Sequence, residues 1–158
     1  MKARLWSRCR ALCLALCLTL PVRAAEVIFL VRHAEKVDGS KDAALSSAGE
    51  ARAKALAGRL RDASVTAVFS TQYQRTKATA QPLADALKIA PVVHPGNDTA
   101  GLVALLAKEH GRALVVGHSN TLPEIAAAFG LQLAIADDEY DALYVLLPAT
   151  KTLIHLRQ

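Results

Sequence analysis

Short apolar runs rich in β-branched and aromatic residues alternate with longer segments of helical spacing, and this alternation restricts the fold more than any other feature of the chain. The spacing predicts strands over residues 26–32, 66–70, 91–94, 112–117, 142–147 and 152–156. It predicts helices over residues 47–61, 74–87, 98–110 and 122–129. This β-α-β-α-β-α-β-α order, followed by a strand pair, is typical of the α/β class, with a mostly parallel sheet covered on both faces.

The helix boundaries are predicted from capping signals. Ser47 followed by Glu50 is a capping-box pattern that opens the first helix. Asp98 is suited to cap the third helix, and Gly111 is expected to end it. Pro82 lies inside the second helix, where a proline can introduce a kink.

The first 24 residues have the composition of a secretory signal peptide. A basic start is followed by the apolar run 11–20 and by small residues that end at Ala24. The apolar run is about half of the ~20 residues that a membrane-spanning helix needs, so removal after Ala24 is favoured over a retained anchor. The sequence therefore predicts one domain over residues 25–158 in a periplasmic or secreted protein.

Removal of this leader changes the meaning of the charge and of the cysteines. The full chain has 19 basic and 14 acidic residues, and the leader holds five of the basic ones and none of the acidic ones. The mature protein is therefore neutral, which argues against binding to nucleic acid or stably to a membrane. All three cysteines (Cys9, Cys13 and Cys17) also lie in the leader, so thiol catalysis, cysteine-ligated zinc and disulfides are not expected.

Basic side chains follow three of the predicted strands at the point where each strand ends. The first strand ends in Arg32 and His33, the second leads to Arg75, and the fourth is followed by His118. Ligands of parallel sheets bind at the carboxyl ends of the strands, so we expect these four side chains to meet. Such a cationic cluster is costly without a bound anion, and arginine matches the geometry of phosphate oxygens. The pattern predicts a phosphate site.

Each of these residues taken alone has an ordinary explanation. A single histidine after a strand is most often a surface or core residue, and a single arginine is most often a solvated charge. Their joint placement at three strand ends is what favours a site. His94, His110 and His155 have no comparable neighbours in the sequence, and we expect them to be structural.

The chain resembles the histidine phosphatase superfamily, which includes the phosphoglycerate mutases. The resemblance is carried by Arg32-His33 after the first strand, by the segment STQYQRTKATA with Arg75, and by the later Gly117-His118. Ala34 follows His33 where glycine is commoner in that family. The resemblance implies a phosphoglycerate mutase-like fold, a three-layer α/β/α sandwich with a mostly parallel central sheet.

The resemblance also implies a role for each of these residues. His33 would be the nucleophile that forms a phosphohistidine, and Arg32, Arg75 and His118 would bind the phosphate oxygens. Nearby guanidinium groups disfavour the imidazolium, which would keep His33 unprotonated near neutral pH. The substrate would be a small phosphate monoester, and neither a metal nor another cofactor is implied.

The general acid for the leaving oxygen is open. Asp98 lies in the loop where the related mutases place a glutamate, and it is equally well explained as a helix cap. Glu35 and Glu124 are the other candidates. A catalytically degenerate module that binds phosphate or a phosphosugar is the alternative function. A metallohydrolase using His33 and His118 is disfavoured because the sequence has no HExxH motif or aspartate-rich cluster.

Overall fold

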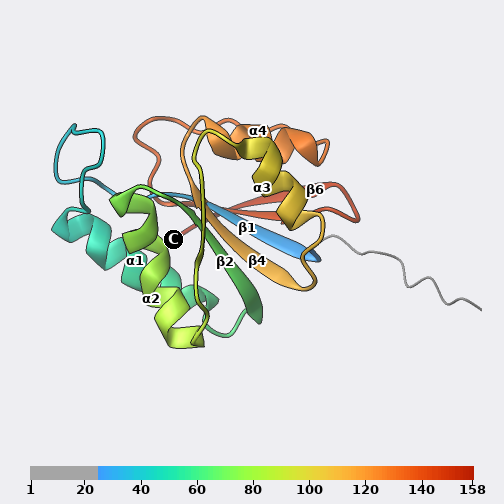
Figure 1. Cartoon of the computed structure of the whole chain (residues 1–158), viewed down its shortest axis with the longest axis horizontal. Helices are drawn as coiled ribbons and strands as arrows, with labels where there is room; N and C mark the ends of the chain where they lie inside the picture. The colour runs from blue at the N-terminus through green and yellow to red at the C-terminus, as the bar shows by residue number, and fades with distance from the viewer. Residues whose placement is uncertain (1–24) are drawn as a thin grey trace, which may run out of the picture.

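The computed structural model describes residues 25–158, so the predicted leader lies outside the described residues. Ten elements follow one another along the chain (Figure 1). They are β1 (Val27–Arg32), α1 (Ser47–Leu60), β2 (Val65–Thr71), α2 (Gln74–Leu87), β3 (Val92–His94), α3 (Thr99–Leu106), β4 (Arg112–Gly117), α4 (Thr121–Ala128), β5 (Ala142–Leu147) and β6 (Thr152–Arg157). All ten overlap the elements that the sequence predicts.

The strands form one sheet in the order β3-β2-β4-β1-β5-β6. The first four strands of that order are parallel, whereas β5 and β6 extend the sheet as an antiparallel pair. The prediction of a mostly parallel sheet is confirmed. The two central strands, β1 and β4, are buried along nearly their whole length because helices cover both of their faces.

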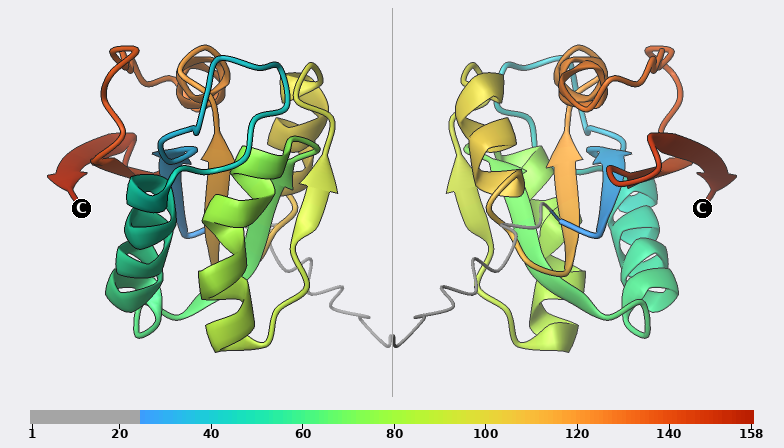
Figure 2. Two further views of the ribbon diagram at one scale, coloured as in Figure 1. Left: turned by 90° about the vertical axis from the view of Figure 1, so that its left-hand side faces the viewer. Right: turned by 90° about the vertical axis from the view of Figure 1, so that its right-hand side faces the viewer.

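Two helices cover each face of the sheet, which confirms the three-layer architecture (Figure 2). On one face, α1 and α2 pack Leu56, Leu60 and Leu83 against the sheet in one hydrophobic cluster. On the other face, α3 and α4 contribute Leu106 and Ile125 to a second cluster. The arrowheads of β1, β3 and β4 point to the same end of the sheet, so the loops that follow them lie together (Figure 2).

The helix α1 begins at Ser47 as predicted, but its capping residue is one position earlier than the predicted capping-box pattern places it. Ser46, not Ser47, is the N-cap, because the Ser46 hydroxyl accepts a hydrogen bond of 3.2 Å from the Gly49 amide. Gly49 itself lies so close to the preceding loop that a Cβ there would come within 2.3 Å of the Glu35 carbonyl oxygen. The first turn of α1 therefore supports the segment that follows β1.

The predicted end of α3 is also wrong. The helix ends at Leu106, four residues before His110, and a tight turn follows in which the Lys108 amide donates to the Leu105 carbonyl. Gly111 then adopts a φ of +108°, which a residue with a side chain rarely adopts. The start of α3 is confirmed, since the Asp98 side chain accepts a hydrogen bond from the Gly101 amide.

The helix α2 continues through Pro82, which does not end it.

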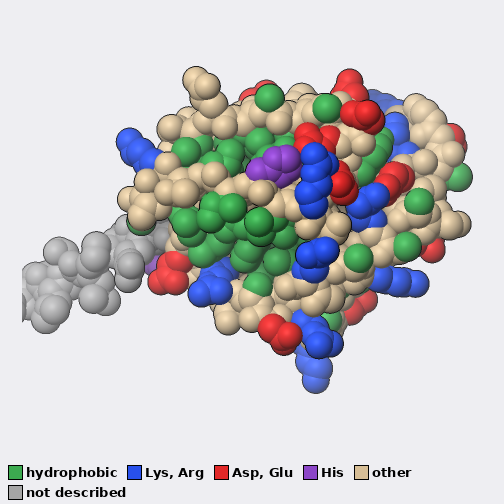
Figure 3. Space-filling model, turned by 180° about the vertical axis from the view of Figure 1, so that it is seen from behind, with side chains coloured by type: hydrophobic (Ala, Val, Ile, Leu, Met, Phe, Trp, Pro, Cys, Tyr) green, Lys and Arg blue, Asp and Glu red, His purple; other side chains and the backbone are tan. Residues whose placement is uncertain are grey.

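The strand β6 forms the edge of the sheet opposite β3, and its side chains Ile154 and Leu156 are exposed. Viewed from behind, this side of the molecule shows a patch of hydrophobic side chains around a histidine, with acidic and basic side chains beside it (Figure 3). Within residues 25–158, no helix has both the length and the apolar character needed to cross a bilayer.

Candidate active site

The register between β1 and β4 brings the two predicted active-site histidines to one level. Arg32 lies opposite Gly117 in the parallel ladder, so His33 and His118 each follow immediately after paired residues. A backbone hydrogen bond of 3.0 Å from the His33 amide to the Gly117 carbonyl joins the two chain segments. The two imidazole rings meet edge to face, with 5.4 Å between their centroids.

His33 is buried and its ring is oriented by the backbone. Its Nδ1 lies 2.8 Å from the carbonyl oxygen of Ala34. Because a carbonyl only accepts, Nδ1 must carry the proton, and a neutral His33 therefore has its lone pair on Nε2. No other described residue makes a hydrogen bond with Nε2, which is free to face a ligand.

Ala34 completes the support of His33. Its amide donates a 3.0 Å hydrogen bond to the hydroxyl of Thr79, which in turn donates to the Arg75 carbonyl on α2. The methyl group of Ala34 is fully buried in a small cluster with Leu45 and Ala53. The side chain that replaces the family's commoner glycine is thus absorbed by packing, while the carbonyl that orients His33 is retained.

His118 is oriented differently, by a pair of threonine hydroxyls. Its Nε2 lies 3.1 Å from the Thr71 hydroxyl oxygen at the end of β2. That oxygen lies 2.8 Å from the hydroxyl oxygen of Thr76 in the first turn of α2. The Thr76 hydroxyl is also within 3.0 Å of the Thr71 carbonyl and 2.8 Å of the Tyr73 carbonyl. The Nδ1 atom of His118 makes no hydrogen bond within the described chain and remains available to a ligand.

Both imidazoles are held in the neutral form. The pKa of His33 is lowered from 6.5 to about 4, mainly by burial and also by the charges of Arg75 and Arg32, against the opposing effect of the Ala34 carbonyl. Burial also lowers the pKa of His118 to about 4, with Arg75, His33 and Arg32 as further causes. Both arginines therefore act on both histidines, which shows that the four side chains share one environment.

The Arg32 guanidinium is fixed by the loop that precedes β5. Its Nη1 donates to the carbonyl of Ala136 at 3.2 Å and to that of Asp137. Its guanidinium carbon lies 4.3 Å from the centroid of the Tyr140 ring, within the range of a cation–π contact. The same ring lies 6.0 Å from the His33 imidazole, so Tyr140 contacts both members of the Arg32-His33 pair.

Arg75 is held in an equivalent way on the opposite side. Its Nη1 donates a 2.8 Å hydrogen bond to the Lys41 carbonyl, and its guanidinium carbon lies 4.4 Å from the centroid of the Tyr73 ring. The Tyr73 ring lies 5.5 Å from the His118 imidazole. Among the described residues, the Nε atoms of Arg32 and Arg75 are both buried without a hydrogen-bond partner. Unpaired buried donors of this kind indicate a place for an anionic acceptor.

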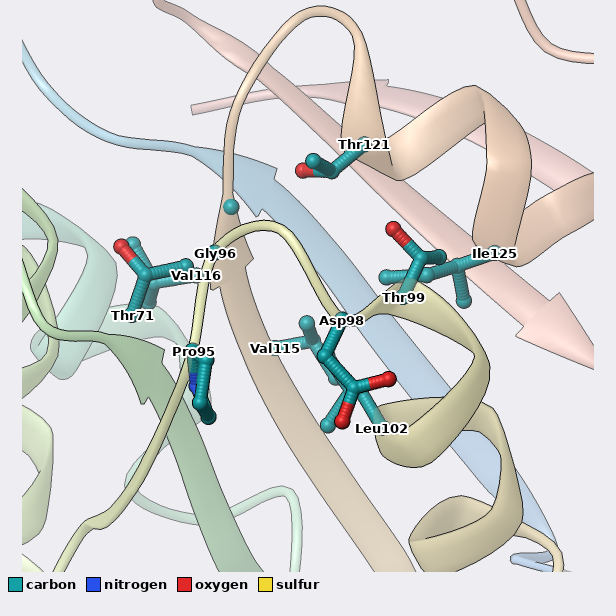
Figure 4. A pocket seen from close by; sticks show the side chains of 11 residues that line it. Thr71, Pro95, Gly96, Asp98, Thr99, Leu102, Val115, Val116, Thr121 and Ile125 are labelled. Atoms are coloured by element: carbon teal, nitrogen blue, oxygen red, sulfur yellow. The ribbon is translucent and has the colours of Figure 1, made fainter.

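Asp98, the favoured candidate for the general acid, is engaged in local structure. Its Oδ1 accepts from the Gly101 amide at 2.9 Å and its Oδ2 lies 3.2 Å from His94 Nε2. It lines a recess together with Thr71 and Thr121, but its carboxylate points away from both of them (Figure 4). No hydrogen bond or ion pair within the described chain joins it to the histidine pair. Its assignment as general acid stays a prediction.

The other two acidic candidates are also engaged. Glu35 forms a two-pronged ion pair with Arg52, with contacts of 2.5 to 2.9 Å. The hydrogen bonds from Arg52 lower the pKa of Glu35, which disfavours its protonated form. Glu124 accepts a 2.6 Å hydrogen bond from Thr99 at the start of α3. The structure therefore brings Arg32, His33, Arg75 and His118 together, but adds no carboxyl group to them by a direct polar contact.

Four residues of the site were not predicted from the sequence. Thr71 and Thr76 lie at the end of a predicted strand and in the first turn of a predicted helix, but the sequence indicated no role for their hydroxyls. Tyr73 was detectable in the same segment as an aromatic residue two positions before Arg75. Tyr140 lies in the irregular loop between α4 and β5, where no periodic pattern placed it.

This arrangement can bind a tetrahedral oxyanion and attack it with a neutral imidazole. Each guanidinium is held by a backbone carbonyl and an aromatic ring, and the charges of both act on the two imidazoles, whose rings meet edge to face. Among residues 25–158, no group of three or more His, Cys, Asp or Glu side chains is placed to hold a metal ion.

Comparison with known sequences finds similarity to one family over part of the chain. A family model described as the histidine phosphatase superfamily (branch 1) matches residues 28–97, which contain Arg32, His33 and Arg75. This match supports the histidine phosphatase superfamily for the segment that carries three of the four site residues. A protein of Erwinia tasmaniensis named as the phosphoglycerate mutase GpmB is 35% identical over 75 residues, and a GpmB of Yersinia enterocolitica is 33% identical over the same length. Each match covers 43% of this chain and 35% of the relative, so the chain matches about a third of the length of these proteins.

Solved structures share the fold over most of the chain. A structure from Agrobacterium tumefaciens described as a phosphohistidine phosphatase, SixA, superimposes with a TM-score of 0.65 at 21% identity and covers 84% of this chain and 99% of its own. A mycobacterial glucosyl-3-phosphoglycerate phosphatase gives a TM-score of 0.62 at 16% identity, covering 77% of this chain and 90% of its own. At these identities the superpositions show a common fold alone. The shared fold extends beyond the residues that the family model matches.

Proposed function

We propose that this protein is a metal-independent phosphatase that hydrolyses small phosphate monoesters through a phosphohistidine at His33. The observation that carries the proposal is the hydrogen bond from His33 Nδ1 to the Ala34 carbonyl. This bond leaves the lone pair of a neutral imidazole on Nε2, which is the form required for attack on phosphorus. The names of similar proteins, which include a phosphohistidine phosphatase, a glucosyl-3-phosphoglycerate phosphatase and phosphoglycerate mutases, agree with phosphoryl-transfer chemistry.

The low pKa of His33 keeps the imidazole unprotonated at Nε2, and therefore nucleophilic, near neutral pH. Burial first, and then the charges of Arg75 and Arg32, lower this pKa to about 4. The same guanidiniums would donate to the phosphate oxygens, on which negative charge accumulates as the phosphoryl group is transferred. Their positive charge supplies the neutralisation that a metal ion gives in other phosphatases, and this supports metal independence.

The reaction proceeds in two displacements at phosphorus. His33 Nε2 forms a bond to phosphorus as the ester P–O bond breaks, and the leaving alkoxide takes a proton to become an alcohol. Water then attacks the phosphohistidine as the P–N bond breaks, and one water proton returns to the group that protonated the alkoxide. Inorganic phosphate leaves with His33 restored to its neutral form. Asp98 is retained as the proposed proton donor of the first step, which requires its carboxylate to turn away from Gly101 and His94.

We also propose that the protein acts outside the cytoplasm, in the periplasm or after secretion. This rests on the leader pattern over residues 1–24, with its basic start, its short apolar run and its small residues before Ala25. The neutral balance of the remaining chain supports a small phosphorylated substrate in preference to nucleic acid or a membrane surface.

Trapping the covalent intermediate tests this proposal. The purified protein is mixed with a ³²P-labelled phosphate monoester in the presence of a chelator and quenched in alkali, where phosphohistidine survives. We expect acid-labile label on His33 and release of inorganic phosphate that the chelator does not reduce. His33→Ala should lose both, whereas His110→Ala, which changes an exposed histidine outside the site, should retain both.

Two results would contradict the proposal in different ways. Turnover that survives in His33→Ala and is abolished by the chelator would indicate a metal-dependent hydrolase. Tight binding of phosphate or a phosphosugar without turnover would indicate the degenerate binding module.

A further inference from the structure

The threonine pair behind His118 forms a hydrogen-bond chain whose proton positions can be deduced. Thr76 contributes one hydroxyl proton, and its oxygen contacts the Tyr73 and Thr71 carbonyls at 2.8 and 3.0 Å. These carbonyls can only accept, so Thr76 donates to them. The 2.8 Å contact between the two hydroxyls is then filled by the Thr71 proton. Thr71 has no second proton to give, and the 3.1 Å contact with His118 requires that Nε2 carries the hydrogen.

The opposite proton arrangement satisfies fewer groups. If Thr71 donated to His118 Nε2, Thr76 would have to donate to Thr71, and both carbonyls would lose their hydroxyl donor. Three of these hydroxyl contacts are buried and the one with the Tyr73 carbonyl is partly buried, so a lost hydrogen bond is costly. The chain that runs from Nε2–H through both hydroxyls to the Tyr73 carbonyl is therefore favoured.

This direction has a consequence for anion binding. A neutral His118 that keeps its hydrogen on Nε2 has a lone pair on Nδ1, and Nδ1 is the only ring nitrogen left for a ligand. A lone pair repels the oxygens of an anion, so His118 can ligate an oxyanion through nitrogen only after Nδ1 gains a proton. Burial and the charge of Arg75 keep that proton off in the free protein, where the pKa of His118 is about 4.

We propose that Thr71 and Thr76 are positioning residues that hold His118 in its Nε2–H form, so that the binding of an oxyanion dianion is coupled to the uptake of one proton from solvent at His118 Nδ1. The proposal rests on the proposed function only in assuming that His118 contacts the bound oxyanion. Each binding event brings one dianion and one proton from solvent into the site, and no covalent bond forms or breaks.

The groups around His118 suit this coupling. Arg75 on α2 and His33 and Arg32 at the end of β1 all lower its pKa in the free protein. Tyr73 adds an aromatic ring 5.5 Å away, and Asp137 contributes a carboxylate that accepts a hydrogen bond from the adjacent Ser119. No carboxylate contributes to the pKa shift of His118 within the described chain, so the incoming anion supplies the negative charge that favours the proton.

Tungstate is a suitable probe, because it remains an unprotonated dianion in neutral and alkaline solution. Its dissociation constant is measured by calorimetry between about pH 7 and about pH 9 in buffers of different ionisation enthalpy. For the wild type we expect uptake of about one proton and a roughly tenfold weakening of binding per pH unit. Histidine-selective ¹⁵N NMR, assigned with His118→Gln, should show the proton arriving at Nδ1 of His118.

The decisive variant is Thr76→Val. It leaves the contact between Thr71 and His118 intact but frees the Thr71 proton to point at Nε2, which moves the histidine hydrogen to Nδ1. Tungstate binding should then lose its pH dependence and, near pH 9, become tighter than in the wild type. Damage to a purely structural contact would weaken binding at every pH instead.

Two further variants serve as controls. Thr71→Ser keeps a hydroxyl and should retain the proton uptake. Thr66→Val removes a hydroxyl from the opposite end of β2, where it bonds to the Arg112 amide, and should also retain the uptake. Wild-type binding without proton uptake, or uptake that persists in Thr76→Val, would overturn the coupling. A folded wild type that does not bind tungstate would instead contradict the proposed oxyanion site.

Discussion

The two imidazoles at the carboxyl edge of the sheet are both buried and both have a pKa of about 4, yet they turn opposite nitrogens toward the protein. His33 uses Nδ1, which donates to a carbonyl, and exposes Nε2. His118 uses Nε2, which contacts a hydroxyl, and exposes Nδ1. The carbonyl fixes a proton on Nδ1 of His33, whereas the hydroxyl chain favours a proton on Nε2 of His118, so the two neutral rings present their lone pairs on opposite nitrogens.

This difference matches the separate needs of the two positions. A nucleophile must present a lone pair throughout binding, and the fixed partner of His33 ensures this. A ligand for oxygen atoms must present a hydrogen once the anion is bound, and His118 can gain that hydrogen at Nδ1, which makes no hydrogen bond within the described chain. In the proposed mechanism the same burial and the same two arginines serve two chemical roles, and the hydrogen-bond partner of each imidazole distinguishes them.

The largest expected effect separates the two histidines directly. We expect His33→Ala to lower kcat/KM by about 10⁴-fold or more, because no other group can form the covalent intermediate. His118→Ala removes one oxyanion ligand and should cost on the order of 10² to 10³-fold. Steady-state hydrolysis of an aryl phosphate measures both. Equal losses, or failure of His118→Ala to form a phosphoenzyme at all, would show that the two positions are not specialised in this way.

The arginines provide the next test, because they act on both histidines alike. Lysine at Arg32 or Arg75 keeps the charge but removes the buried Nε donor, and we expect kcat/KM to fall roughly 10 to 10²-fold in each variant. Arg112→Lys is the matched control, since Arg112 bonds to the Ala63 carbonyl at the opposite end of the sheet. An unchanged kcat/KM in Arg32→Lys and Arg75→Lys would mean that the unpaired donors do not face the phosphate.

The residues of the site differ in how well the sequence predicts them, for a physical reason. Arg32, His33 and His118 follow buried apolar strands whose pattern is unambiguous, and adjacent parallel strands bring their ends together. The location of Arg75 can also be predicted, because it lies in the first turn of a helix directly after such a strand. Tyr140 comes from a loop whose path is decided by tertiary contacts such as that with Arg32, which no local pattern reports.

The features of the fold also differ in how well the sequence predicts them. Strand and helix identities follow from hydrophobic periodicity, whereas the exact ends depend on single hydrogen bonds. The Ser46 hydroxyl displaces Ser47 as the cap of α1 because it reaches the Gly49 amide. The proton positions at His118 depend on four oxygen atoms that only the packing of α2 against β2 brings into contact.

Protonation of the two histidines should destabilise the folded protein in acid. The unfolded chain takes up these protons near pH 6.5, whereas the folded protein resists them down to about pH 4. Folding stability should therefore be complete above about pH 6.5 and fall as the pH drops toward 4, by roughly 2 to 3 kcal/mol per histidine. Urea unfolding of the wild type at neutral and acid pH measures this loss.

Replacing either histidine should remove its share of that acid sensitivity. His33→Gln and His118→Gln should each show a shallower fall in stability between pH 6.5 and 4 than the wild type. His110→Gln, which changes an exposed histidine, should fall as the wild type does. If only one of the two variants becomes less sensitive to acid, the two imidazoles do not share the same electrostatic environment.

The smallest effect concerns the aromatic rings that flank the pair. Tyr140 contacts Arg32 and His33, and Tyr73 contacts Arg75 and His118, so each ring steadies one arginine and borders one imidazole. A cation–π contact at a partly exposed site contributes about 0.5 to 1 kcal/mol, so leucine at either position should lower kcat/KM by roughly two- to fivefold. Phenylalanine keeps the ring and should remain near wild type. A loss in Tyr140→Phe as large as in Tyr140→Leu would assign the effect to the phenol hydroxyl, and the two sides of the site would then differ in their arginine support as well as in their histidines.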